Sequence, residues 1–108
     1  MLVIDDSELI HRLLKVRLQY ERIDIRCARD SKNGLECSRS FEPDVILLDI
    51  EMGPTDPMDG FAILSELKSD PATRDIPVIF ISASTETMDR VRALELGAID
   101  FVCKPFEV

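Results

Sequence analysis

The chain has 108 residues, 45% of them hydrophobic and 31% charged, which suits one globular domain with a modest core and excludes a disordered chain. Its 21 acidic and 13 basic side chains give a net charge of −8, which argues against direct binding of nucleic acid. No apolar stretch approaches the roughly 20 residues of a membrane helix, and no signal peptide precedes the first apolar run, so we expect a cytoplasmic protein without a membrane partner.

The first half of the chain predicts three strands and two helices. An apolar run at 2–4 predicts a strand, and Ser7 can cap a following helix whose apolar residues recur every three or four positions. Residues 23–28 predict a second strand and 45–48 a third. Between these two strands, residues 31–40 predict a helix that one glycine and one asparagine weaken.

The second half continues the alternation after a loop at 50–59 that is rich in Gly, Pro and Asp. A helix is predicted at 60–69 and a strand at 78–81. A helix at 85–96 is stopped by a glycine, and 101–103 predicts the fifth strand.

Strands that alternate with helices and are almost continuously apolar are typical of a parallel sheet with helices on both faces. We therefore predict an α/β fold with a doubly wound five-stranded parallel sheet. A helix normally follows the fifth strand of such a sheet, yet the sequence ends at Val108. We expect that this last helix is truncated or missing, and that the chain is a fragment of a longer protein.

Polar side chains follow the ends of four predicted strands. Asp5 and Asp6 follow the first, Asp49 the third, Ser82 the fourth and Lys104 the fifth. Because chemistry collects at the carboxyl ends of parallel strands, we expect these groups to share one edge of the sheet. Clustered carboxylates repel each other, and Mg²⁺, which binds oxygen ligands, would offset that repulsion together with the lysine.

This set of residues has the parts needed for phosphoryl transfer. A carboxylate can attack phosphorus and form an acyl phosphate. A metal ion and an ammonium group neutralise the phosphoryl oxygens, and a hydroxyl binds them. Asp49 stands alone after the central strand and is the better nucleophile, whereas the adjacent Asp5 and Asp6 suit a metal pair.

The ordered motifs carry a resemblance that covers almost the whole chain. The sequence resembles the receiver domain of bacterial two-component response regulators, whose fold is the flavodoxin-like, CheY-like sheet. The spacing of 22 residues from Ser82 to Lys104 is also usual in that family. The motifs are Val3-Ile4-Asp5-Asp6-Ser7, Pro43-Asp44-Val45-Ile46-Leu47-Leu48-Asp49-Ile50-Glu51-Met52, Met58-Asp59-Gly60, Ile76-Pro77-Val78-Ile79-Phe80-Ile81-Ser82-Ala83, Gly97-Ala98-Ile99-Asp100-Phe101 and Lys104-Pro105-Phe106.

The resemblance implies that residues 1–108 form one receiver domain in which Asp49 accepts a phosphoryl group from a phosphohistidine. The donor would be a sensor histidine kinase or a phosphotransfer protein. Mg²⁺ would be bound by Asp5, Asp6, Asp49 and the backbone carbonyl of Glu51. Such a domain is a self-phosphorylating and self-dephosphorylating switch, so we do not expect it to be an enzyme.

The resemblance also implies a conformational switch. Ser82 would turn toward the new phosphoryl group and Lys104 would contact it. Phe101 would take the aromatic switch position, with plain core packing as the equal alternative. Glu51 and Ser84 lie where the family tunes the lifetime of the acyl phosphate.

One departure from the family is the spacing of 11 residues from Asp49 to Gly60, about three more than usual. The extra residues fall within 53–57. The simple interpretation is a tolerated surface insertion. The functional alternative is altered partner docking or metal access, because Asp56 adds a carboxylate near the site.

Other reactive or charged residues receive simpler interpretations. We expect His11, the only histidine, to be solvated, and the charged residues of the fourth helix (Glu86, Arg90, Arg92) to form a solvated face. The three cysteines fit no zinc spacing, so we expect reduced thiols in or near the core: Cys27, Cys37 and Cys103.

Two alternatives to the phosphorylation switch stay open. One is an interaction module of the same fold that signals without phosphate. The other, less favoured, is a Mg²⁺-dependent phosphatase with an aspartyl nucleophile, for which the spacing of Glu51 from Asp49 is the only support. The resemblance allows an output domain in a longer chain, with a faint hint of a cyclase fusion, and a homodimer.

Overall fold

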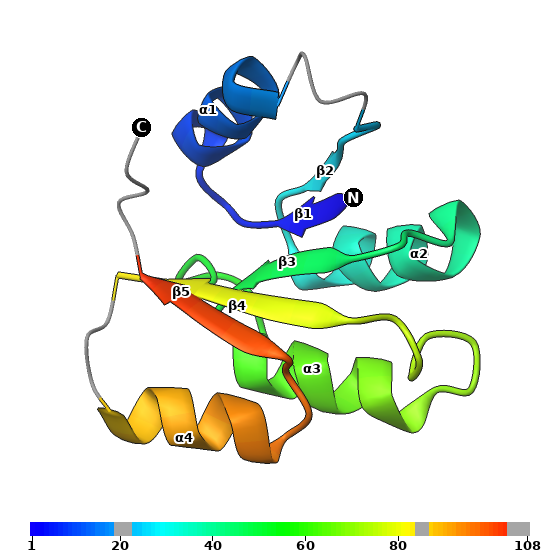
Figure 1. Ribbon diagram of the computed structural model, residues 1–108, viewed down its shortest axis with the longest axis vertical. Coiled ribbons are helices and arrows are strands. Elements are labelled where there is room, and N and C mark those ends of the chain that lie inside the picture. Colours follow the sequence, from blue (N-terminus) through cyan, green and yellow to red (C-terminus); the bar gives the residue numbers. More distant parts are fainter. Residues whose placement is uncertain (19–22, 84–86, 104–108) are drawn as a thin grey trace.

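A computed structural model describes residues 1–18, 23–83 and 87–103, in which five strands and four helices alternate (Figure 1). The elements are β1 (Leu2–Ile4), α1 (Glu8–Leu18), β2 (Arg26–Ala28), α2 (Ser31–Phe41), β3 (Ile46–Asp49), α3 (Gly60–Ser69), β4 (Val78–Ser82), α4 (Thr87–Glu95) and β5 (Asp100–Cys103).

All five strands lie parallel in one sheet with the order β2-β1-β3-β4-β5, which confirms the predicted sheet. Helix α1 lies on the opposite side of the sheet from α3 and α4 (Figure 1). The strand order reverses direction between β1 and β3, where the chain leaves β1 toward one edge and later returns to the other. In sheets of this kind, this switch point is where ligands bind.

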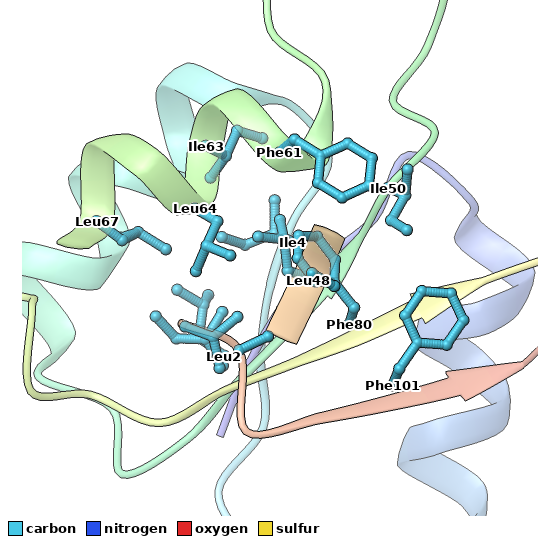
Figure 2. Packing of buried hydrophobic residues seen from close by; sticks show 14 of the residues in the cluster. Leu2, Ile4, Leu48, Ile50, Phe61, Ile63, Leu64, Leu67, Phe80 and Phe101 are labelled. Carbon is cyan, nitrogen blue, oxygen red and sulfur yellow. The ribbon is translucent and has the colours of Figure 1, made fainter. Parts of the chain in front are cut away.

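The main core fills the space between the sheet and the helices α2, α3 and α4 (Figure 2). Leu2, Ile4 and Leu48 from the central strands are fully buried in it, and the rings of Phe61 and Phe80 pack with their centroids 5.4 Å apart. Close packing of this kind fixes the relative positions of the strand ends, on which the site depends.

Aspartate side chains cap the N-termini of two of the helices. The Asp30 side chain accepts from the Asn33 N–H at 2.7 Å and caps α2, while the Asp59 side chain accepts from the Ala62 N–H at 2.9 Å and caps α3. Gly60 is required at the start of α3 because a Cβ there would lie 2.6 Å from the Ile50 Cα and would also clash with the Asp49 carbonyl oxygen.

The second strand is shorter than predicted, and its length has a structural cause. It is an edge strand that, in the described part of the chain, pairs with β1 alone, and β1 has three residues, so pairing runs from Leu2↔Arg26 to Ile4↔Ala28. The expectation for the last helix concerns residues 104–108 and beyond, which lie outside the described part of the chain.

Candidate functional site

Three carboxylates gather at the carboxyl ends of β1 and β3. These strands are paired with Ile4 opposite Leu48, so Asp5, directly after β1, lies beside Asp49, the last residue of β3, and Asp6 is next in the chain. One carboxylate oxygen of each aspartate lies within 4.8 Å of those of the other two. Among the described residues this is the group that can hold a metal ion, and it places the three aspartates together as the sequence predicts.

Burial of two of these aspartates makes the repulsion between the carboxylates unfavourable for the fold. Asp5 is 0% and Asp49 2% exposed, whereas Asp6 is exposed. Two ionised groups about 4 Å apart repel by about 4 kcal/mol at an effective dielectric constant of about 20. The donors are all oxygen atoms, which hard divalent cations such as Mg²⁺ prefer. The donor set therefore fits such a cation, whose charge would offset the repulsion.

Backbone N–H groups orient two of the carboxylates. The Ser7 N–H donates to Asp5 Oδ1 at 2.8 Å, and the Glu51 N–H donates to Asp49 Oδ1 at 3.3 Å. Each carboxylate is thus held by the turn that follows its own strand. The site is built from strand ends and the first residues of their loops.

Ser82 is the last residue of β4 and is 0% exposed. Its hydroxyl donates to Glu51 Oε1 at 2.8 Å. This contact joins the end of β4 to the loop after β3, beside Asp49. Both residues were predicted to have a role in the site, but their contact was not predicted.

Phe101 is 6% exposed and belongs to the main core (Figure 2). The guanidinium of Arg90 lies 5.5 Å from the centre of its ring. Arg92 stacks in the same way on Phe61, at 4.1 Å. Both arginines are exposed, as expected for a solvated face on α4, and each also stacks on an aromatic ring of the core. Glu86, Ser84 and Lys104 lie outside the described residues.

The longer loop after β3 is fastened to the start of α2. The Asp56 carboxylate accepts from the Ser31 hydroxyl at 2.6 Å, the Ser31 N–H at 2.8 Å and the Met58 N–H at 3.0 Å. Burial alone would raise the pKa of Asp56, but these three hydrogen bonds outweigh it and lower the pKa. Asp56 is not in the group that can hold a metal among the described residues, so its carboxylate acts on the loop.

A cleft of about 730 Å³ lies between this loop and the start of α2, with Asp6 on its wall. Gly53 comes close to that residue, since a Cβ on Gly53 would lie 3.2 Å from Asp6 Oδ2. The inserted loop therefore forms one side of the acidic site.

His11 is buried, at 4% exposure, which corrects the expectation that it is solvated. Its Nε2 lies 2.7 Å from the backbone oxygen of Asp5. The helical spacing explains this burial. His11 precedes Leu14 by three residues and therefore lies on the same face of α1. Cys27, Cys37 and Cys103 are partly buried, and Cys37 and Cys103 pack against the main core, in agreement with the predicted position in or near the core.

Comparison with known proteins gives consistent matches. The family model of the response regulator receiver domain matches residues 1–108. The response regulator PleD of Caulobacter vibrioides is 42% identical over 107 residues. The match covers 99% of this chain and 23% of PleD, so the chain spans about a quarter of that relative.

Solved structures agree with these matches. The receiver domain of NtrX from Brucella abortus superposes with a TM-score of 0.88 at 33% identity, covering 98% of this chain and 86% of that one. The Mn²⁺-bound form of the response regulator Rcp1 gives a TM-score of 0.83 at 26% identity, covering 99% and 81%. Among the helices of the described residues, none has the length and apolar character to cross a membrane.

Proposed function

The chain belongs to the response regulator receiver domain family, and from this premise we propose that Asp49 is the residue that accepts the phosphoryl group. A receiver domain of two-component response regulators is a phosphoacceptor signalling module. The observation that carries the assignment is the position of Asp49, buried at the end of β3 with carboxylate oxygens of Asp5 and Asp6 within 4.8 Å.

We infer that Mg²⁺ is the cofactor and that Asp5, Asp6, Asp49 and the backbone carbonyl of Glu51 hold it. The all-oxygen donor set supports this choice, and the related Rcp1 has been described in a Mn²⁺-bound form. When bound, the cation supplies charge neutralisation for the phosphoryl oxygens.

The transfer step uses the carboxylate as a nucleophile. An oxygen of Asp49 forms a bond to phosphorus while the bond from phosphorus to the donor's imidazole nitrogen breaks. The electron pair of that bond stays on the nitrogen that carried phosphorus, and with a proton on its other nitrogen the ring leaves as neutral imidazole. The Glu51 N–H orients the attacking carboxylate through Asp49 Oδ1 at 3.3 Å.

Ser82 and Lys104 complete the phosphoryl site in this proposal. The hydroxyl of Ser82 is already at the end of the neighbouring strand β4. Lys104 follows β5, which pairs with β4 so that Ser82 is opposite Cys103. The aromatic switch falls to Phe101, whose ring packs in the core beneath Arg90.

The partners follow from the family assignment. We propose a cytoplasmic domain that receives its phosphoryl group from a sensor histidine kinase or a phosphotransfer protein. Because the chain spans 23% of PleD, we also propose that this domain acts on an output domain in a longer protein. The phosphatase alternative is not favoured, since the Glu51 carboxylate that it needs as a general acid is bound by Ser82.

The proposal is tested by intact mass spectrometry after incubation with acetyl phosphate and Mg²⁺. The wild type should gain the mass of one phosphoryl group, and this gain should disappear with EDTA or in Asp49→Asn. Asp44→Asn, which removes an exposed carboxylate just before β3, is the matched control and should still be phosphorylated. A folded wild type that gains no mass would contradict the proposal and favour a module that signals without phosphate.

A further inference from the structure

The contact between Glu51 and Ser82 links the loop after the phosphoacceptor to the residue expected to sense the phosphoryl group. The Ser82 hydroxyl donates to Glu51 Oε1 at 2.8 Å. We propose that Glu51 is a latch that holds the Ser82 hydroxyl in its resting orientation, and that a phosphoryl group on Asp49 must displace the latch to recruit that hydroxyl. This inference rests on the proposed function of Asp49.

The backbone holds Glu51 in place for this role. The Ile50 N–H donates to the Ile81 carbonyl at 3.2 Å, and the Ile50 carbonyl accepts from the Gly60 N–H at 2.8 Å. These two bonds tie the residue before Glu51 both to the end of β4 and to the start of α3. The Glu51 side chain is thereby directed across the end of β3 toward Ser82.

The Ser82 hydroxyl can donate one hydrogen bond, and in the resting state it donates it to Glu51. Ser82 is 0% exposed, so its hydroxyl cannot exchange this partner for bulk water without a movement of the chain. A phosphoryl group on Asp49 would offer competing acceptor oxygens. The resting and switched orientations of Ser82 therefore exclude each other, as a two-state element requires.

The acceptor on the latch is a carboxylate, which makes the bond stronger than one between neutral groups. The charge of Glu51 also repels a phosphoryl group on Asp49. Both effects favour the unphosphorylated state, but only the first depends on Ser82. That difference allows the latch to be separated from simple repulsion.

The test measures the affinity for beryllofluoride, a mimic of the phosphoryl group, in the presence of Mg²⁺. The variants are Glu51→Ala, which removes the acceptor, and Glu51→Gln, which keeps an acceptor oxygen without the charge. The matched control is Glu66→Ala, which removes an exposed carboxylate on α3. We expect the Kd to fall about fivefold or more in Glu51→Ala, less in Glu51→Gln, and not at all in Glu66→Ala.

The decisive comparison repeats Glu51→Ala in a Ser82→Ala background. If Glu51 acts as a latch, most of the gain in affinity should vanish there, because the hydroxyl for which both acceptors compete is gone. An equal gain in both backgrounds would show repulsion alone and overturn the latch. Ser82→Cys, which keeps a weak donor, provides a second background should the alanine variant fold poorly.

The outcomes separate the latch from the proposed function. If the wild type binds beryllofluoride and Glu51→Ala binds it no more tightly, the latch is overturned and Asp49 keeps its role. If the folded wild type binds no beryllofluoride with Mg²⁺, the proposed function fails and the latch fails with it.

Discussion

The loop between β3 and α3 carries one carboxylate at its start and another in its inserted part, and both accept hydrogen bonds from serines of neighbouring elements. Glu51, beside the phosphoacceptor, accepts from the Ser82 hydroxyl. Asp56, in the inserted part, accepts from the hydroxyl and the N–H of Ser31 and from the Met58 N–H. One contact reaches the switch position, and the other reaches the start of a helix.

A carboxylate that accepts a hydrogen bond from a serine can therefore act in two ways. At Glu51 the serine can change to another acceptor, whereas at Asp56 the hydrogen bonds hold the loop in place. The Asp56 carboxylate binds two backbone N–H groups and a hydroxyl, so its release would leave several donors unsatisfied. The Glu51 side chain is exposed, and in the described part of the chain it is bound through a side-chain hydroxyl that has another acceptor available after phosphorylation. We therefore expect Asp56 to affect stability and Glu51 to affect switching.

The largest effect on stability should come from Gly60→Ala. The Gly60 N–H donates to the Ile50 carbonyl, so this glycine joins the end of the loop to its beginning. The added Cβ would lie 2.6 Å from the Ile50 Cα, and backbone cannot move aside cheaply. We expect a loss of about 3 kcal/mol in the free energy of unfolding, measured by urea denaturation. Gly53→Ala, which faces the movable Asp6 side chain at 3.2 Å, should cost less than about 1 kcal/mol, and equal losses would contradict this account of the anchor.

Asp56→Ala should destabilise the domain by about 2 kcal/mol, because it removes the partner of Ser31, which is 4% exposed. Thr55→Ala, at an exposed position of the same loop, is the control and should change the free energy of unfolding by less than about 0.5 kcal/mol. Phosphorylation by acetyl phosphate should persist in both. Loss of phosphorylation in a folded Asp56→Ala variant would show that the inserted part of the loop and its start beside Asp49 do not act independently.

The pH dependence of the free energy of unfolding should be a smaller effect than the loss in Asp56→Ala. The pKa of Asp56 is lowered from its ordinary value of 3.8, so the ionised carboxylate stabilises the fold. This contribution is present above the ordinary pKa and is lost as the pH falls through the lowered folded-state value. The stability difference between the wild type and Asp56→Asn should therefore be larger at neutral pH than in strong acid. A difference that grows on acidification would show the opposite sign.

The smallest effect on stability should be that of Glu51→Ala. Its loss leaves the Ser82 hydroxyl without this acceptor, which should lower the free energy of unfolding by about 1 kcal/mol in thermal or urea unfolding. This is less than for Asp56→Ala, which leaves a hydroxyl and two N–H groups without their acceptor. The same variant should change beryllofluoride binding as described above. A loss of stability comparable to that of Asp56→Ala would make Glu51 a structural residue and remove the contrast.

The sequence was sufficient to predict the sheet and the acidic cluster. Four of the five strands are short apolar runs with a polar residue at or after their ends, and the parallel topology brings Asp5, Asp6 and Asp49 to one edge. The contacts of Glu51 and Asp56 were not predictable in the same way, because they depend on the path of a loop that has no periodic pattern. The burial of His11 was predictable from its spacing to Leu14, but the flanking Arg12 made a solvated site appear simpler.

The central claim is that three aspartates from two strand ends form a metal-dependent site at which Asp49 is phosphorylated. Borohydride reduction tests it directly, since it converts an aspartyl phosphate to homoserine that peptide mapping can locate. After treatment with acetyl phosphate and Mg²⁺, we predict homoserine at position 49, and none there when EDTA is present. Homoserine at another aspartate, or at none in the folded protein, would contradict the account.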